Sequence, residues 1–211
     1  PLVLSSIVSI IYMRIDQIMI KEMLGESEVG IYSAAVRISE MWYFVPMIVA
    51  SSLYPAIINA KKQSEILYYS RLQRIISLLA WISIIVSITM FFLSDTLIYL
   101  LFGNAYIKAG NVLVIHIWTG LFVCFGVVSS KWFLIENLQV LAFKRTFLGM
   151  LANIGLNFLL IPSFGIMGAA FATFVSQMIA AYLSDVLNQK TRPIFWMKTR
   201  AFLPQSLMEV F

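Results

Sequence analysis

Long stretches without a charged side chain dominate the pattern of hydrophobic and polar positions along this chain. No Asp, Glu, Lys or Arg occurs at positions 41–60, 75–93 or 146–184. An apolar stretch of about 20 residues is long enough to cross the hydrocarbon core of a bilayer as a helix. The pattern therefore predicts several membrane-spanning helices.

Glycine, proline and short polar clusters divide the chain into six predicted spans. Gly25 and Gly103 end the first and third spans, a turn at 162–165 separates the last two, and Pro46 and Pro55 are expected to kink the second. We expect an all-α integral membrane protein with a six-transmembrane-helix bundle. The predicted spans are about 1–22, 30–58, 75–102, 107–131, 140–161 and 166–187, so that the bundle covers residues 1–187.

Two polar segments do not fit a span. The segment 59–74 is polar and basic, and the tail 188–211 places Phe195 and Trp196 between Arg and Lys residues. Such a basic and aromatic tail is typical of a segment that lies at the membrane interface.

Composition agrees with this class. The chain has 211 residues, of which 61% are hydrophobic and 12% charged, whereas a soluble domain has about 45–50% apolar and about 25% charged residues. Its one cysteine, Cys124, and one histidine, His116, leave no metal-ligand set, and we expect no metal and no cofactor. The net charge of +5 is explained by membrane topology rather than by nucleic acid, which we do not expect as a partner.

Basic residues predict the orientation. If six spans are correct, eleven of the fifteen Lys and Arg residues lie on one side, whereas the opposite turns hold only Lys21 and Lys108. The positive-inside rule then places both ends of the sequence in the cytoplasm. The eleven are Lys61, Lys62, Arg71, Arg74, Lys131, Lys144, Arg145, Lys190, Arg192, Lys198 and Arg200.

Two stretches carry a family resemblance. Residues 14–42 (RIDQIMIKEMLGESEVGIYSAAVRISEMW) lead from an Asp-containing helix through Leu-Gly to Val-Gly-Ile-Tyr and small residues, and residues 151–177 (LANIGLNFLLIPSFGIMGAAFATFVSQ) join an Asn-rich helix to Ile-Pro, Gly-Ala-Ala and Ala-Thr. Together they resemble the polysaccharide transporter family of the MOP flippase superfamily, specifically the O-antigen (Wzx-type) flippases. The tail TRPIFWMKTRAF is also similar to the C-termini of these flippases.

The resemblance implies a MATE-like fold of twelve helices in two lobes, of which this chain corresponds to the C-terminal six-helix half. It implies a flippase that moves polyprenyl-diphosphate-linked O-antigen or polysaccharide repeat units across the bacterial inner membrane by alternating access. The implied partners are the lipid-linked oligosaccharide, membrane lipids, the missing N-terminal lobe and the O-antigen polymerase machinery. The resemblance does not specify the sugar, the coupling ion or the oligomeric state.

Other functions stay open. A peptidoglycan-precursor flippase would also carry a lipid diphosphate, and a multidrug exporter would share the fold but favour an acidic cavity. A membrane glycosyltransferase or polymerase needs a polar loop with paired carboxylates, and no connecting segment exceeds about twenty residues, so we do not expect an enzyme.

Charges inside the first two spans are the candidate functional residues, because a charge at membrane depth is costly and usually lines a polar cavity. Arg14 and Asp16 are about 200° apart on a helix and cannot share a face. Arg14 either binds an anionic headgroup, or it reaches the membrane surface or pairs locally. Asp16 could couple transport to an ion. Arg37 and Glu40 lie three residues apart, so Arg37 either binds substrate or pairs with Glu40, which could itself titrate.

Two amides are further candidates. Asn153 and Asn157 are four residues apart and share one face of the fifth span. They either bind the sugar or join helices by hydrogen bonds, as amides in membranes commonly do.

Overall fold

The computed structural model describes residues 2–203, with side chains from residue 8 onward. Position 1 of the first predicted span and positions 204–211 of the predicted tail lie outside the described residues. Within the described part the chain is helical and contains no strand. The helices are α1 (Leu2–Leu24), α2 (Glu26–Met41), α3 (Phe44–Gln63), α4 (Glu65–Phe102), η1 (Asn104–Tyr106), α5 (Ala109–His116), α6 (Thr119–Ile135), α7 (Gln139–Ala181), η2 (Leu183–Val186) and α8 (Arg192–Arg200).

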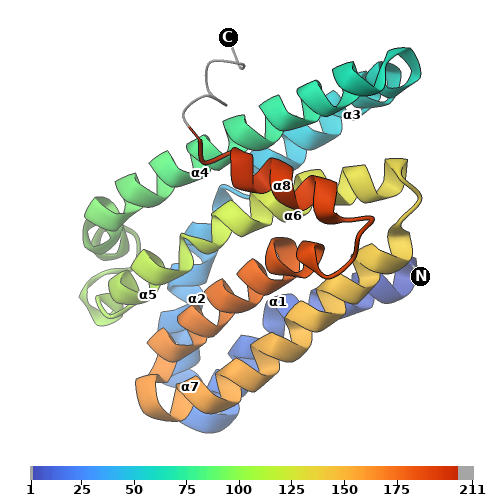
Figure 1. The fold of residues 1–211 in the computed structure, drawn as a ribbon. Coiled ribbons are helices and arrows are strands. Elements are labelled where there is room, and N and C mark those ends of the chain that lie inside the picture. Colours follow the sequence, from blue (N-terminus) through green and yellow to red (C-terminus); the bar gives the residue numbers. More distant parts are fainter. Residues whose placement is uncertain (1, 204–211) are drawn as a thin grey trace.

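Four helical segments are long and apolar enough to cross a membrane, which makes this a multi-pass membrane protein. They cover 26–63, 65–102, 109–135 and 139–186. The last contains two rods, because Gly165 has φ 59° and ψ −142°, a conformation that glycine tolerates best. Figure 1 shows α7 reversing direction between its gold and orange parts. The division into six spans stays a prediction, because α1 is not among the four apolar segments.

The rods alternate between two ends of the bundle (Figure 1). The N-terminus, the α3–α4 turn and the α6–α7 turn lie at one end, and the α1–α2 turn, the α4–α5 connection and the reversal within α7 lie at the other. At the first end, which we call the basic end, Lys61 Nζ is 2.7 Å from Glu136 Oε1, and the Tyr68 hydroxyl donates to the same oxygen at 2.8 Å. These bonds hold the two turns together.

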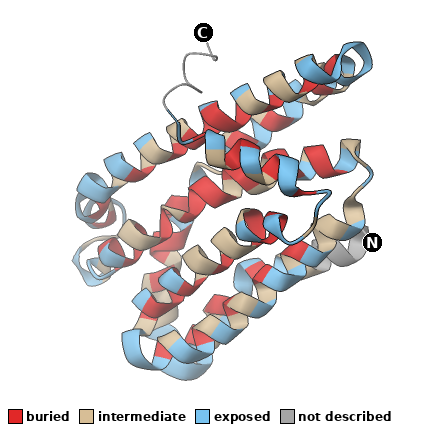
Figure 2. Cartoon of the chain, viewed as in Figure 1, coloured by how far each residue is buried: buried red, intermediate tan, exposed pale blue. Residues whose placement is uncertain are grey.

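Two apolar cores lie along the bundle. One joins α3, α4, α6 and α8 around residues such as Trp132 and Phe125, and the other joins α1, α2, α5 and the middle of α7 around residues such as Ile20 and Ile166. Many large apolar side chains remain exposed on the outer surface, including Phe92 at 76%. Figure 2 shows this pattern as red between the helices and pale blue on the outside. Apolar surface outside a packed core is what a bilayer covers.

The structure adds local detail to the second and third predicted spans. The polar segment 59–74 is helical except at Ser64, where α3 ends and α4 begins. The helix continues through Pro46 and Pro55, and the interruption of the second span lies earlier, at Trp42 and Tyr43. There the amide of Tyr43 donates to the carbonyl of Glu40, three residues back, so one tight turn separates α2 from α3.

Candidate functional site

Arg14, Arg37 and Glu40 lie around one hollow between α1 and α2. The hollow has a volume of about 270 Å³, and Gln17, Ser33 and Val36 complete its lining. Arg14 is half exposed, and its Nη2 lies 3.7 Å from Oε2 of Glu40. Both residues are therefore accessible, although each lies within one of the predicted spans.

The alternative in which Arg37 pairs with Glu40 is not what the structure shows. Among the described residues, no carboxylate oxygen lies within 4 Å of the Arg37 guanidinium, and Glu40 is paired with Arg14 instead. Arg37 is exposed and points a cationic side chain into the hollow without an ion-pair partner from this part of the chain.

Asp16 lies on the opposite face of α1, as the two-residue spacing predicts. Its side chain is only 4% exposed. One carboxylate oxygen accepts hydrogen bonds from the Tyr32 hydroxyl of α2 and, at 3.4 Å, from the Thr173 hydroxyl of α7, and the other accepts the Gln17 amide at 2.8 Å. Three helices thus meet at this carboxylate.

A chain of hydrogen bonds continues from Thr173 to the other rod of α7. The Asn153 amide nitrogen donates to the hydroxyls of Thr173 at 3.4 Å and Ser176 at 3.2 Å, and the Asn157 amide nitrogen donates to Asn153 Oδ1 at 3.0 Å. The Tyr12 hydroxyl of α1 donates to Ser176 Oγ at 3.0 Å. Both asparagines are fully buried, so they join the two rods of α7 and do not line the arginine hollow.

A second cavity, of about 230 Å³, lies between α1, α2, α6 and α7 and touches both candidate carboxylates. Its walls include Asp16, Glu40, Tyr43, His116, Arg145 and Thr173. His116 is buried, and its Nδ1 lies 2.5 Å from Ser39 Oγ. Glu40 borders this cavity as well as the hollow that contains the two arginines, so one side chain connects the two spaces.

Sequence reasoning missed several members of this arrangement. Tyr32 and Thr173 lie within the two resembling stretches, yet nothing in their spacing indicates that both hydroxyls reach Asp16. The sequence pattern places Arg145 among the surface charges that set topology, but it is only 8% exposed and donates to the Gly126 carbonyl at 3.0 Å and to Ser130 Oγ at 3.2 Å. Lys198, another of the eleven basic residues predicted to lie on the cytoplasmic side, is fully buried.

No metal-ligand cluster accompanies these residues. Within the described part of the chain, no group of three or more His, Cys, Asp or Glu side chains could hold a metal ion.

Comparison with known proteins supports the resemblance. Residues 1–111 match the model of a family described as "Polysaccharide biosynthesis protein". Agl15 of Haloferax volcanii, named a probable low-salt glycan biosynthesis flippase, is 29% identical over 197 residues, which is 89% of this chain and 41% of Agl15. CapF of Staphylococcus aureus, a capsular polysaccharide biosynthesis protein, is 23% identical over 85% of this chain and 46% of CapF.

A further relative, AglR of Haloferax volcanii, is named a probable flippase and is 27% identical over 82% of this chain and 37% of its own length. The chain thus spans less than half the length of each of these curated relatives. No solved structure matches it.

Proposed function

The chain belongs to the polysaccharide biosynthesis protein family, and we propose that it forms the C-terminal six-helix lobe of a flippase. The whole protein would move a polyprenyl-diphosphate-linked O-antigen or polysaccharide repeat unit across the bacterial inner membrane. Two relatives named as probable flippases, each covering more than four fifths of this chain, support the proposal. The protein would be a transporter and not an enzyme.

One observation carries the proposal most directly: Arg14 and Arg37 share an open hollow between α1 and α2, and α2 belongs to a segment apolar enough to cross a membrane. A guanidinium group at membrane depth is expensive to expose to lipid. The hollow is therefore best placed facing the missing N-terminal lobe, where it would line a polar passage. Two guanidinium groups suit a diphosphate, because their planar N–H donors pair with phosphate oxygens.

Charge balance in the hollow favours an anionic substrate. Arg14 and Arg37 contribute two positive charges and Glu40 one negative charge. A multidrug exporter of amphipathic cations would want the opposite sign. A peptidoglycan-precursor flippase remains the nearest alternative, because its substrate has the same lipid-diphosphate headgroup.

Movement would follow the scheme common to paired helical lobes. Alternating access requires the two lobes to rock about a site near the midplane, so that the passage opens first to one side and then to the other. The sugar headgroup would pass between the lobes while the polyprenyl tail stays in lipid. The basic end of the bundle would face the cytoplasm.

Asp16 and Glu40 would couple this movement to an ion. Asp16 is a buried carboxylate surrounded by the hydroxyls of Tyr32 and Thr173, and oxygen ligands of this kind suit a small hard cation or a transferred proton. Glu40 borders both the Asp16 cavity and the arginine hollow, so a change in the charge of Glu40 would act on the ion site and on the substrate site together.

The test uses the full-length protein in cells that lack their own flippase. Arg37→Glu reverses a charge in the hollow and should reduce surface display of the glycan at least about tenfold, which is the loss expected from one charged contact. Lys108→Gln, at an exposed position at the opposite end from the basic end, is the control and should leave display unchanged. Normal display by Arg37→Glu, at equal membrane abundance, would exclude the hollow from transport.

A further inference from the structure

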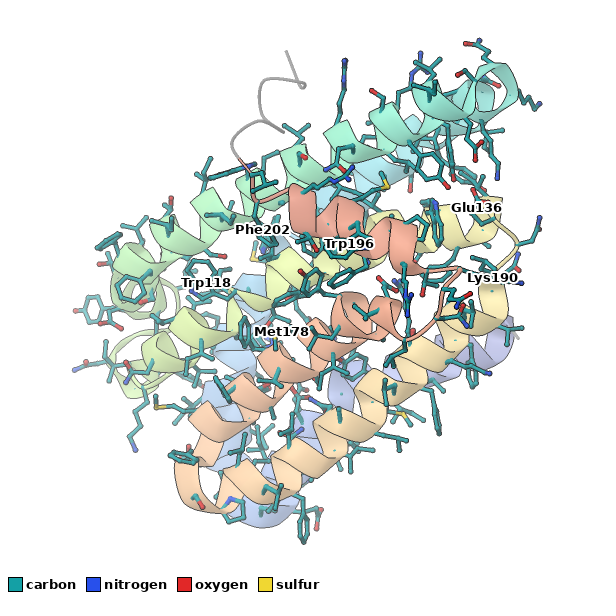
Figure 3. The ribbon with its side chains drawn as sticks, in the orientation of Figure 1. Trp118, Glu136, Met178, Lys190, Trp196 and Phe202 are labelled. Carbon is teal, nitrogen blue, oxygen red and sulfur yellow. The ribbon has the colours of Figure 1, made fainter. Side chains whose placement is uncertain are left out.

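A third cavity lies at the basic end, away from the arginine hollow. It has a volume of about 190 Å³ and is enclosed by the end of α6, the first turns of α7 and the segment from η2 to α8. Figure 3 places Glu136 and Lys190, which flank this region in sequence, at the same end of the bundle. Two cations, Lys144 and Arg145, occupy one side of the cavity.

One of the two terminal nitrogen atoms of Arg145 has a hydrogen-bond acceptor in the described part of the chain, and the other has none. Its Nη2 donates to the Gly126 carbonyl and Ser130 Oγ, and its guanidinium stacks on the Phe133 ring with 4.6 Å between Cζ and the ring centre. Its Nη1, although buried, has no hydrogen-bond partner in the described part of the chain. A buried charged donor without an acceptor is costly, and an anion would remove that cost.

The carboxylate in the cavity wall is already neutralised. Lys198 Nζ lies 2.5 Å from Asp185 Oδ2 and also donates to the Ala181 carbonyl at 2.6 Å. Both side chains of this pair are fully buried. The charge of Asp185 is therefore compensated from α8, and the local balance at the cavity is set by Lys144 and Arg145.

The remaining wall combines apolar residues with the polar Ser184, Asn188 and Thr191, and its leucines reach the outer surface of the bundle. Leu148 is 38% exposed and Leu187 is 76% exposed, and both border the cavity. A cavity with cations on one side and exposed leucines on the other fits an amphiphile whose acid group points inward. Its volume, the space of several water molecules, admits a phosphate group but not an oligosaccharide.

We propose that this cavity binds the phosphate group of a membrane lipid, through Arg145 and Lys144. The site is separate from the arginine hollow, but Arg145 also borders the cavity that contains Asp16 and Glu40. Phosphoglycerides and polyprenyl phosphates both carry a phosphate group on an apolar chain. The cavity would therefore bind the phosphate group and the first part of the acyl or prenyl chain. A bound lipid would also seal the junction between α7 and η2.

Native mass spectrometry of the full-length protein in detergent tests this directly. Phosphatidylglycerol, a polyprenyl phosphate and inorganic phosphate are titrated separately. Lys144→Gln, at an exposed position on the cavity wall, should weaken binding of both lipids about tenfold. Lys62→Gln, an exposed cation at the same end but outside the cavity, should bind them like the wild type.

Arg145→Lys tests the buried member of the pair, because it keeps the charge and removes the planar donor fork. It should weaken lipid binding to a similar extent. Equal lipid binding by the Lys144→Gln and Lys62→Gln variants would overturn the proposal. Displacement of bound lipid by inorganic phosphate at the same concentration would also overturn it, because the site would then read a free anion and not a lipid.

Discussion

Nη2 of Arg14 lies 3.7 Å from Oε2 of Glu40, and this contact joins the middle of α1 to the end of α2. The pair is accessible, with the Arg14 side chain 51% and the Glu40 side chain 22% exposed. It is therefore weak, and it leaves Arg14 able to exchange its partner for a phosphate oxygen. In this arrangement Glu40 competes with the proposed substrate for the guanidinium group.

Removing that competition gives a first prediction. Glu40→Gln should change the free energy of unfolding by less than about 1 kcal/mol, because the pair is partly exposed to solvent. The same change should raise the affinity of the full-length protein for a lipid diphosphate severalfold. Glu65→Gln, an exposed carboxylate in the first turn of α4, is the control and should leave affinity unchanged. Weaker binding by Glu40→Gln would show that Glu40 contacts the substrate itself.

Thr173 gives a prediction about ion coupling. Thr173→Val keeps the shape of the side chain but removes the hydroxyl between Asp16 and Asn153. We expect a loss of about 0.5–1.5 kcal/mol in stability, because two long hydrogen bonds are lost while Tyr32 still bonds Asp16 and Ser176 still bonds Asn153. We also expect weaker dependence of transport on sodium or proton gradients. Thr89→Val is the matched control, since the Thr89 hydroxyl is exposed and bonds the Ile85 carbonyl of its own helix. If transport by Thr173→Val depends on the ion gradient as it does in the wild type, the Asp16 site does not couple transport to an ion.

Docking of α8 should depend on pH. Burial lowers the pKa of Lys198 from near 10.5 to about 8, against the opposing effect of Asp185. The docked helix thus binds this proton more weakly than an undocked helix in water. Docking should therefore strengthen as pH rises from about 8 to about 10.5, by at most about 1.4 kcal/mol per pH unit, and stay constant below about pH 8.

Hydrogen exchange of the α8 amides, corrected for the intrinsic effect of pH, measures this dependence. Lys198→Met should remove it, because no titrating group remains at that position. Protection that decreases as pH rises above about 8 would contradict the predicted direction.

The close packing of Trp42 against Gly120 of α6 gives a stability prediction. A Cβ atom added to Gly120 would overlap the Trp42 ring, whereas a Cβ atom at Gly155 meets nothing within 4 Å. Gly120→Ala should therefore cost about 1–3 kcal/mol, and Gly155→Ala should be neutral or stabilising by up to about 1 kcal/mol. Thermal unfolding of the two variants in detergent compares them. Equal melting temperatures would show that Trp42 moves freely.

Sequence alone was sufficient for the helical class and for the two faces of α1. Uncharged runs and the spacing of Arg14 and Asp16 depend only on chain length and helix geometry. The partners of these residues were not predictable, because Glu40 and Thr173 reach them from helices that are adjacent only after folding. The buried state of Arg145 and Lys198 was missed for a related reason. Each is neighbour to polar or basic residues in sequence, and only the packing of α6, α7 and α8 removes it from water.

Positions 37 and 88 offer the most direct comparison for the central proposal. In the full-length protein, a photoreactive amino acid replaces either Arg37, in the arginine hollow, or Ile88, which is 47% exposed on α4. Each variant is supplied with the lipid-linked oligosaccharide. We predict crosslinks to the glycan headgroup from position 37 and none above background from position 88. Headgroup crosslinks from position 88 with none from position 37 would contradict the account, because the arginine hollow would then lie outside the passage.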